Sequence, residues 1–308
     1  MSRAVTLLGP QRRPTLHRVL QPSGPDARVA TVTAGWQERE RDDGELHELL
    51  GGRSVNLGLY ERWLDVLERD HEYAVAEREH RTVLDELQRF YRVQLDHALR
   101  ATYALAQRHD GHPRTRESAL ADALAVVNVV DQQHVTRMQE VWQAFYDGWR
   151  PQERTAVAEH RAAVQQALGS AEALVVAGGH VDVLVRVLHL FHLSPHLPAR
   201  VVAWSAGAMA LSERVVLFHD NAPQGPAQTE VFDEGLGVLS RVVLLPHARR
   251  RLLLDDLTRM SVLSRRFAPA RCVVLDDGTH LDLGDDGALP PQAKVVGTDG
   301  RITTVAAA

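Results

Sequence analysis

An apolar strand that leads directly into a serine and then into small residues is the feature that most constrains this fold. Residues 201–213 read Val-Val-Ala-Trp-Ser-Ala-Gly-Ala-Met-Ala-Leu-Ser-Glu, so helix-forming residues follow Ser205 at once. This order is typical of a nucleophile elbow, the sharp strand–turn–helix connection that lifts a serine above the edge of a sheet. The small residues Ala203 and Gly207 would let strand and helix pack closely. A buried strand followed by an ordinary turn is the alternative interpretation.

Short β-branched segments on both sides of this motif predict an α/β fold. Short apolar strands that alternate with helices favour a mostly parallel sheet covered on both faces. We therefore expect one α/β domain built from residues 1–56 and 170–308. The strands are predicted at residues 5–8, 28–33, 173–177, 201–204, 215–218, 242–245, 272–275, 295–297 and 302–305.

Residues 57–169 predict a large all-helical insertion into this domain. Apolar residues recur every three or four positions between His80 and Leu105, which indicates a helix of roughly 35 residues with one apolar stripe. A second helix is predicted from Leu120 to Trp149, after the break at Gly111-His112-Pro113. Two long antiparallel helices are the natural arrangement.

The insertion carries more aromatic residues than the seam between two helices needs. Each buried Leu or Phe side chain is worth ~1.5–3 kcal/mol, so a long apolar stripe must be covered. We expect the spare apolar face to form a homodimer contact or a lid over Ser205, and an intramolecular cap without another role is the alternative. The aromatic residues are Trp63, Tyr73, Tyr103, Trp142, Tyr146 and Trp149.

Composition argues against several classes of function. The net charge is −5 and charges of both signs are interspersed, which gives no footprint for nucleic acid or for an anionic membrane. Apolar segments are too short to span a bilayer, and residues 1–14 lack the apolar core of a secretory signal. Cys272 is the only cysteine, which excludes internal disulfides and cysteine-based zinc sites. We expect a soluble, cytoplasmic protein.

The helical insertion invites a metal interpretation, because an acid and a histidine three residues apart share one face of a helix. Such pairs are common by chance in a chain with 16 histidines and 40 acidic residues, and further carboxylates on an apolar face are missing. We therefore expect no metal and no cofactor. The pairs are Glu68 with His71, Glu77 with His80, and Asp131 with His134.

An activated serine in this chain needs a histidine as its base. Lys294 is the only lysine, and its place in a Pro-rich segment near the C-terminus argues against a Ser–Lys mechanism. His247 follows the strand predicted at 242–245, and ligands gather at the carboxyl ends of parallel strands. His180 and His219 are the rival bases.

Further residues could complete a site around Ser205. Ala177-Gly178-Gly179-His180 follows a strand and precedes a helix, so its amides could supply an oxyanion donor, although a plain turn explains them equally well. Two acids could orient His247. Asp220 lies 15 residues after the serine, and Asp277 follows the strand predicted at 272–275.

The sequence resembles the family of peptidase E, the aspartyl dipeptidase, and of the cyanophycinases. Their nucleophile motif reads Gly-[Thr/Trp]-Ser-Ala-Gly-Ala, and residues 204–208 read Trp-Ser-Ala-Gly-Ala. The resemblance covers about residues 1–56 and 170–308. Its other parts are Thr33-Ala34-Gly35, Ala177-Gly178-Gly179, residues 234–239 with the following His247, the Arg251, Leu254 and Leu257 spacing, Leu275-Asp276-Asp277-Gly278-Thr279, and the strand pair near 296–303.

The resemblance implies a flavodoxin-like fold, related to the class I glutamine amidotransferases, and a serine peptidase acting on small Asp-containing or β-aspartyl peptides. Ser205 would be the nucleophile and His247 the general base. Asp277 would orient His247, while Asp220 stands where peptidase E also has an acid, so both assignments stay open.

The resemblance also suggests the groups that hold the substrate. The backbone amides of Gly179 and Ala206 would form the oxyanion hole. Gly178 and His180 would line the substrate site, and the guanidinium of Arg251 would grip an aspartyl carboxylate. His180 replaces the usual Asn or Asp, which weakens the inference about substrate more than the inference about chemistry.

Two other functions fit parts of the sequence. A glutamine amidotransferase of this fold uses a cysteine at the elbow, and Cys272 does not lie on one. A catalytically silent scaffold that binds a ligand or partner through the helical insertion is the main alternative, against which the ordered serine, histidine and acid argue.

Overall fold

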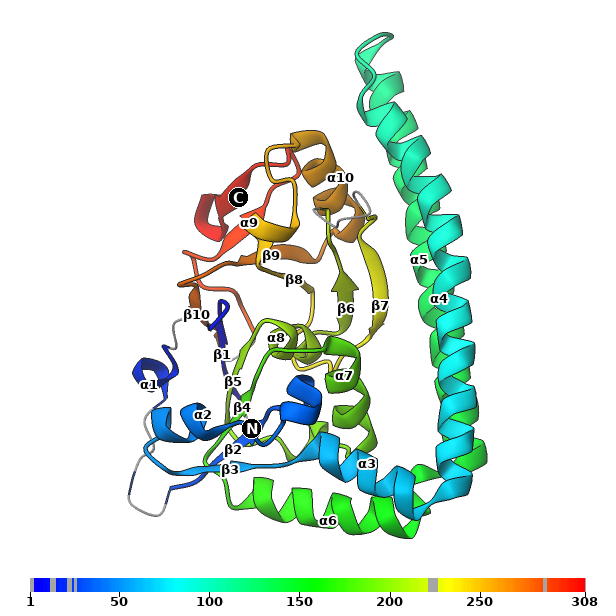
Figure 1. Ribbon diagram of the computed structural model, residues 1–308. Helices are drawn as coiled ribbons and strands as arrows, with labels where there is room; N and C mark the ends of the chain where they lie inside the picture. Colours follow the sequence, from blue (N-terminus) through cyan, green and yellow to red (C-terminus); the bar gives the residue numbers. More distant parts are fainter. Residues whose placement is uncertain are drawn as a thin grey trace.

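A six-stranded sheet forms the centre of the α/β part, and its strands are parallel except at one edge (Figure 1). The computed structural model describes residues 3–11, 15–20, 24, 27–220, 227–284 and 287–307. The mixed α/β architecture predicted from the sequence is confirmed. In spatial order the strands are β10 (His280–Asp282), β1 (Ala4–Leu8), β5 (Arg200–Trp204), β4 (Ala173–Val176), β2 (Val29–Val32) and β3 (Ser54–Asn56).

The remaining strands form two smaller sheets, whereas the sequence pattern suggested one continuous sheet. In the four-stranded sheet β8 and β9 are parallel and the other neighbours antiparallel. A separate pair consists of β6 (Arg214–Leu217) and β7 (Glu230–Glu234). The four strands are β12 (Ile302–Thr304), β11 (Lys294–Val296), β9 (Arg271–Leu275) and β8 (Val242–Pro246).

Helices cover both faces of the six-stranded sheet, so its central strands are buried on both sides. In β5, Val201 and Ala203 belong to one hydrophobic core, and Val202 and Trp204 belong to a second. This alternation follows from the two-residue period of a strand. The second core includes residues of α1 (Leu16–Val19) and α2 (Gly44–Leu49), and the first includes residues of α7 (Val181–Leu190) and α8 (Ala206–Leu211).

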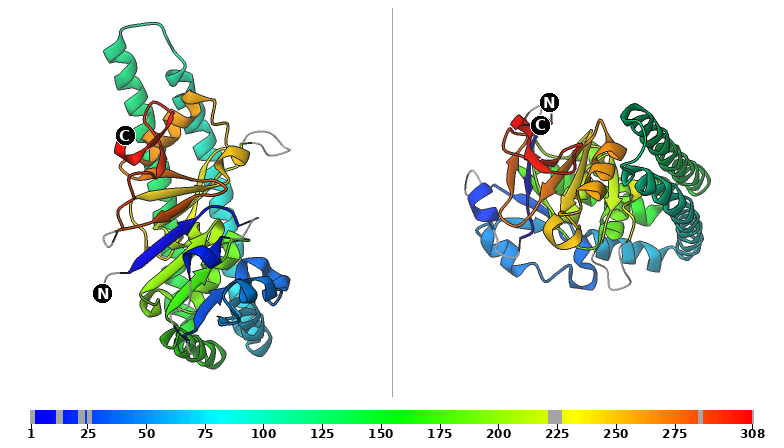
Figure 2. Two further views of the ribbon diagram at one scale, coloured as in Figure 1. Left: turned by 90° about the vertical axis from the view of Figure 1, so that its left-hand side faces the viewer. Right: turned by 90° about the horizontal axis from the view of Figure 1, so that it is seen from above.

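A long helical hairpin stands beside the α/β body, and its tip extends past that body (Figures 1 and 2). It lies between two shorter helices, α3 (Leu59–Arg69) and α6 (Thr155–Gly169), which join it to β3 and β4. Pro113 begins the second long helix, where the missing N–H costs nothing. The two long helices are α4 (His71–Ala106) and α5 (Pro113–Trp149).

The buried face of α4 differs in part from the stripe that periodicity predicts. Tyr91, Leu95 and Leu99 recur at four-residue spacing and are at most 2% exposed. Val83 and Phe90, which the predicted stripe includes, are 43% and 67% exposed. The spacing of apolar residues identifies the helix. It does not determine which of several adjacent positions on the helical wheel are buried, because that depends on the element that packs against the helix.

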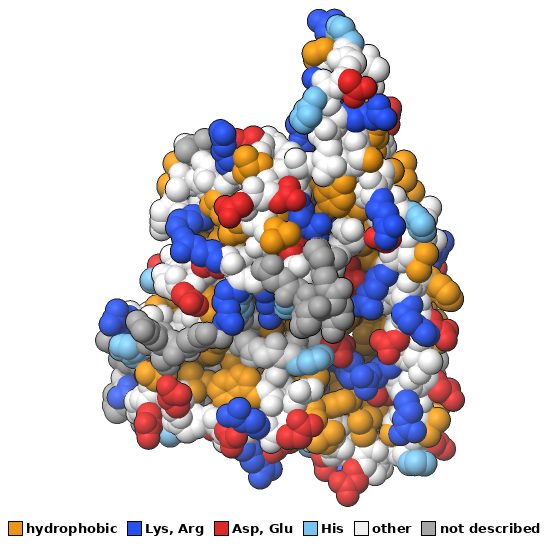
Figure 3. Space-filling view, turned by 45° about the horizontal axis from the view of Figure 1, so that its top comes forward, with side chains coloured by type: hydrophobic (Ala, Val, Ile, Leu, Met, Phe, Trp, Pro, Cys, Tyr) orange, Lys and Arg blue, Asp and Glu red, His pale blue; other side chains and the backbone are white. Residues whose placement is uncertain are grey.

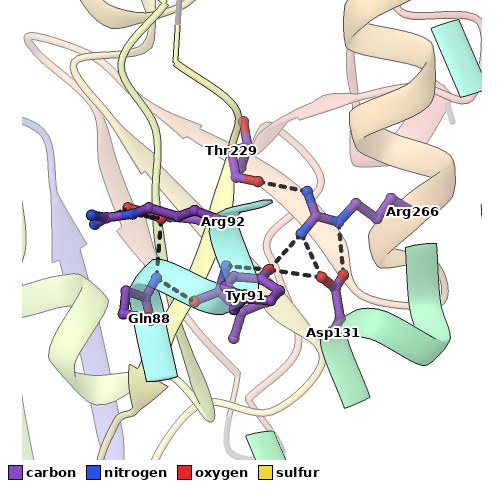
Figure 4. Close-up of polar contacts among 8 residues, drawn as sticks. Gln88, Tyr91, Arg92, Asp131, Thr229 and Arg266 are labelled. Carbon is purple, nitrogen blue, oxygen red and sulfur yellow. Dashed lines mark hydrogen bonds and ion pairs between the residues drawn. The ribbon is translucent and has the colours of Figure 1, made fainter. Parts of the chain in front are cut away.

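A buried polar network fixes the hairpin to the body (Figure 4). Arg266 of α10 (Leu257–Phe267) donates two hydrogen bonds of 2.7 Å to Asp131 of α5 and one of 3.0 Å to the Tyr91 hydroxyl of α4. The guanidinium also donates to the carbonyl of Thr229, at 2.6 Å. Arg92 adds a bidentate ion pair with Glu230 at the edge of the network. A buried charge survives only when paired and hydrogen-bonded in this way.

Two of the three histidines of the acid-x-x-His pairs pack against aromatic rings, whereas His71 is exposed. His134 stacks on Tyr91 with ring centres 4.0 Å apart, and His80 stacks on Phe145 at 4.3 Å. Burial lowers the pKa of both histidines to about 4, so both rings are neutral near pH 7. The described residues contain no group of three or more His, Cys, Asp or Glu side chains placed to hold a metal ion.

The surface carries charges of both signs. On the face drawn in Figure 3, basic and acidic side chains are interspersed over the body and the hairpin. Among the helices that the structure describes, none is long and apolar enough to cross a membrane.

Candidate active site

Ser205 occupies a strained turn between β5 and α8. Its backbone angles are φ 51° and ψ −124°, which an L-residue adopts rarely. The turn is tight because a Cβ on Gly207 would lie 2.3 Å from the carbonyl oxygen of Val176 and 2.5 Å from that of Ala177. These features are those of a nucleophile elbow. The side chain is held above the carboxyl edge of the six-stranded sheet.

His247 reaches this serine from the other sheet. It follows β8 in a left-handed conformation, with φ 57° and ψ 33°, and its N–H donates to the carbonyl of Leu275 at 3.1 Å. Its Nε2 lies 3.4 Å from Oγ of Ser205. Helix α8 packs against both β5 and β8, which brings the ends of the two sheets together. The distance is at the long end for a hydrogen bond, as is usual before substrate binds.

The turn after β4 closes against the serine. A Cβ on Gly178 would lie 2.8 Å from Cβ of Ser205, so only glycine fits there. Gly179 has φ 136° and would place a Cβ 2.3 Å from the carbonyl oxygen of Gly35. Within the described part of the chain, the amides of Gly179 and Ala206 donate no hydrogen bond. Two free N–H groups beside a serine are the components of an oxyanion hole.

His180 is the residue before α7, and its side chain is exposed. Its N–H donates to the carbonyl of Gly35 at 2.7 Å, which ties the turn after β4 to the segment after β2. The backbone of His180 therefore shapes the turn, while its imidazole is accessible from solvent.

Asp220 is buried and supports the segment that follows His247. One carboxylate oxygen accepts the N–H of Leu253 at 3.1 Å, and the other pairs with Arg259 at 2.5 Å. Its own N–H donates to the carbonyl of Arg251 at 2.6 Å. Asp220 thus contacts the main chain four to six residues beyond His247.

Asp277 lies in the turn after β9 and is exposed. The last residue of that strand, Leu275, accepts the N–H of His247, so the turn begins beside the histidine. Asp276, which the sequence did not single out as a site residue, accepts the N–H of Arg249 at 3.1 Å. The turn after β9 and the segment after β8 are therefore joined.

Arg251 ends the short helix α9 (Ala248–Arg251) that begins after His247. Its N–H donates to the carbonyl of His247 at 3.0 Å. The guanidinium is half-buried, and among the described residues it makes no ion pair. Burial, followed by the neighbouring charge of Arg250, lowers the pKa of Arg251. An anion bound there would offset both effects.

A cavity that sequence reasoning missed lies at the carboxyl end of β5, although Ser205 itself does not line it. Its walls include Trp204, the residue before Ser205, and Trp36, and its volume is about 410 Å³. Gln37 at this edge has φ 57° and ψ −123°, almost the angles of Ser205. The sequence feature that could have indicated this cavity is the predicted strand end at Thr33-Ala34-Gly35, because that strand ends at the same edge of the sheet as the strand before the serine.

Comparisons with known proteins place the chain in a family. The model of peptidase family S51 matches residues 124–289, which is more than half of the chain and includes Ser205, His247, Asp220 and Asp277. No curated protein matches. A solved structure, that of a peptidase from an acI-B1 Actinobacterium, is 14% identical with a TM-score of 0.42, and the match covers 96% of this chain and 88% of that one. On the strength of the family model, the chain belongs to peptidase family S51.

Proposed function

We propose that this protein is a serine peptidase that hydrolyses small Asp-containing or β-aspartyl peptides through Ser205 and His247. The observation that carries the proposal is the 3.4 Å approach of His247 Nε2 to Ser205 Oγ at a strained elbow. Strain in a non-glycine residue costs ~1–3 kcal/mol and persists where the surrounding fold enforces it, often at a reactive side chain.

The proposed reaction is acyl transfer in two steps. His247 takes the proton of Ser205 as Oγ attacks the peptide carbonyl, and the amides of Gly179 and Ala206 stabilise the oxyanion. The protonated histidine then gives its proton to the leaving amine, which frees the first product. Water attacks the acyl-enzyme with His247 again as base, and the second product leaves with a carboxyl group.

The two acids take different parts in this proposal. Asp277 is the proposed orienting acid, supported by its position in the turn after β9, beside the N–H contact of His247. Asp220 is the alternative, and its contacts with Leu253 and Arg259 support a positioning role through the main chain. Asp277→Asn should lower kcat without changing the melting temperature. Asp220→Asn should lower both, because it weakens a buried pair.

Substrate preference is assigned to Arg251. Its half-buried guanidinium, without an ion pair in the described structure, is suited to the side-chain carboxylate of an aspartyl residue. Gly178 and His180 complete the proposed site, because the turn after β4 closes against Ser205.

A fluorophosphonate probe tests the proposal directly. It should label Ser205 stoichiometrically in the native protein, and hydrolysis of Asp-Leu and β-Asp-Leu should be measured in parallel. Ser205→Ala should abolish labelling and lower kcat about a thousandfold or more. Ser170→Ala, an exposed serine in α6's C-terminal cap, is the matched control and should leave both unchanged. Absence of labelling and of hydrolysis would instead favour the catalytically silent scaffold.

A further inference from the structure

A recess between the helical hairpin and the body lies outside the proposed active site. Residues of α3, α4, α5, α7 and β7 line it, and its volume is about 50 Å³. An open groove of about 690 Å³ adjoins it, because Trp142, Tyr146 and Asp233 line both. The recess, called here the hairpin recess, is therefore a small, mainly apolar pocket with some polar side chains, and it opens into a groove along the hairpin.

Buried polar atoms without a hydrogen-bond partner gather in the hairpin recess. Within the described residues, Glu77 Oε1, His80 Nε2 and Gln88 Oε1 make no hydrogen bond, and the indole Nε1 of Trp63 makes none of ordinary geometry, although its N–H lies close enough to Glu77 to lower the pKa of that carboxyl group. Each of these four residues is at least nine-tenths buried. Buried polar atoms in proteins nearly always have a partner, protein or otherwise. Because the carboxylate and amide oxygens accept and the neutral imidazole offers an acceptor nitrogen, the partner that fits here is rich in N–H donors.

The hairpin recess is lined by more carboxylates than cations, because Arg81 and Arg186 face the four acids Glu77, Asp85, Asp182 and Asp233 among its described lining residues. Arg186 is already engaged by Asp182, with hydrogen bonds of 2.7 and 2.8 Å, and lies 3.7 Å from Glu77. Burial raises the pKa of Glu77, and it raises the pKa of Asp233 to about 7. Desolvation is the largest cause for both groups, and the charges of Arg186 and Arg81 offset it only in part at Glu77. A bound cation would relieve both groups.

Aromatic rings form the apolar walls. The recess is lined by Trp63, Trp142 and Phe145, and the groove continues along Trp142 and Tyr146. The faces of such rings attract organic cations, and their edges and bodies accommodate a hydrocarbon chain. The recess is large enough for an ammonium group and little more, whereas the groove has room for the chain attached to it.

We propose that the hairpin recess and its groove form a binding site for a small aliphatic amine. Its ammonium group donates hydrogen bonds to the acceptors contributed by Glu77, His80 and Gln88, and its carbon chain lies along Trp142 and Tyr146. The site is built jointly by the helical insertion and the body, so the amine stabilises the packing of one against the other. The proposal does not depend on Ser205 being reactive.

Calorimetric titration of the full-length protein with 1,5-diaminopentane tests this site. Saturable binding at millimolar or lower concentration is expected, together with a change in tryptophan fluorescence and a raised melting temperature. Binding of n-pentanol with equal affinity would overturn the proposal, because it would mean that the chain alone is recognised. The absence of saturable binding would also overturn it, since ordered water would then satisfy the polar atoms.

Matched variants locate the amine. Glu77→Gln keeps the shape and removes the charge, so it should weaken binding at least tenfold. Glu79→Gln, on the exposed face of the same helix, should leave affinity unchanged. Asp233→Asn provides a second variant with the same expected loss if Glu77→Gln does not fold. Equal affinities for Glu79→Gln and for both recess variants would refute the assignment.

Discussion

Arg251 is the residue on which the choice of substrate depends. A charge-assisted hydrogen bond is worth ~1.5–3 kcal/mol, so its loss should cost about tenfold to a hundredfold in kcat/KM for an anionic substrate. Arg251→Ala should therefore lower kcat/KM for Asp-Leu much more than for Asn-Leu. Arg249→Ala is the control, because that side chain is 74% exposed and pairs with Asp276. An equal loss for both dipeptides would reduce Arg251 to a structural residue.

The folded protein should lose stability at acid pH in part because of His134. Burial lowers the pKa of His134 from 6.5 to about 4 in the folded protein. The unfolded chain therefore binds a proton between these values that the folded chain does not, so stability is complete above pH 6.5 and falls as the pH drops toward 4. The free energy of unfolding should fall by up to about 3 kcal/mol over this pH range.

Urea unfolding at pH 7 and pH 5 measures this effect. His134→Phe keeps an aromatic ring against Tyr91 and cannot be protonated, so it should lose less stability between the two pH values than the native protein. His97→Phe, at an exposed position of α4, should keep the native pH dependence. Identical pH profiles for all three proteins would contradict the linkage.

The positions of residues that directly follow a strand were the easiest to predict from the sequence, and the side chains that they contact were the hardest. Ser205 and His247 each follow an apolar strand, so their meeting at one edge could be anticipated. The pairing of Asp220 with Arg259 could not be anticipated, because it depends on where α10 packs. Trp36 shows the same limit: its neighbours are known only once α1, α2 and β5 are in place.

At the scale of elements, the hairpin depends on one buried ion pair. Asp131 and Arg266 are both 4% exposed and join α5 to α10. Removing one partner of such a pair leaves an uncompensated charge and typically costs ~3–5 kcal/mol. Asp131→Ala should therefore lower the free energy of unfolding by about that amount, or let the hairpin separate from the body.

Chemical denaturation and limited proteolysis of α4 and α5 would measure both outcomes. Asp122→Ala removes an exposed carboxylate from the same helix and should be neutral. Native stability in Asp131→Ala would mean that aromatic packing alone holds the hairpin. Periodicity predicted both long helices, but it could not predict this anchor, because Asp131 resembles any polar residue of an amphipathic helix until Arg266 is brought to it.

At the scale of the whole molecule, the hairpin presents apolar side chains to solvent. Phe90 is 67% exposed and Val93 is 59% exposed on α4, and Val126 and Val129 are more than half exposed on α5. The described parts of the body pack mainly against the hairpin through α3, α10 and β7, which leaves these residues uncovered. Large apolar side chains exposed in number along one part of a protein commonly mark a contact with another chain.

We propose that this surface forms a homodimer, one of the two contacts expected from the sequence, although not through the aromatic residues that led to that expectation, of which Trp149 alone is exposed. Light scattering should give a dimer, and Phe90→Glu should give a monomer, because burying a carboxylate in an apolar interface is costly. Ile302→Glu, at a residue of β12 that is 39% exposed, should leave the dimer intact. The hairpin recess lies on the side of α4 that faces the body, so amine binding should survive in the Phe90→Glu monomer. A native protein that is monomeric at every concentration would leave the hairpin as an intramolecular cap.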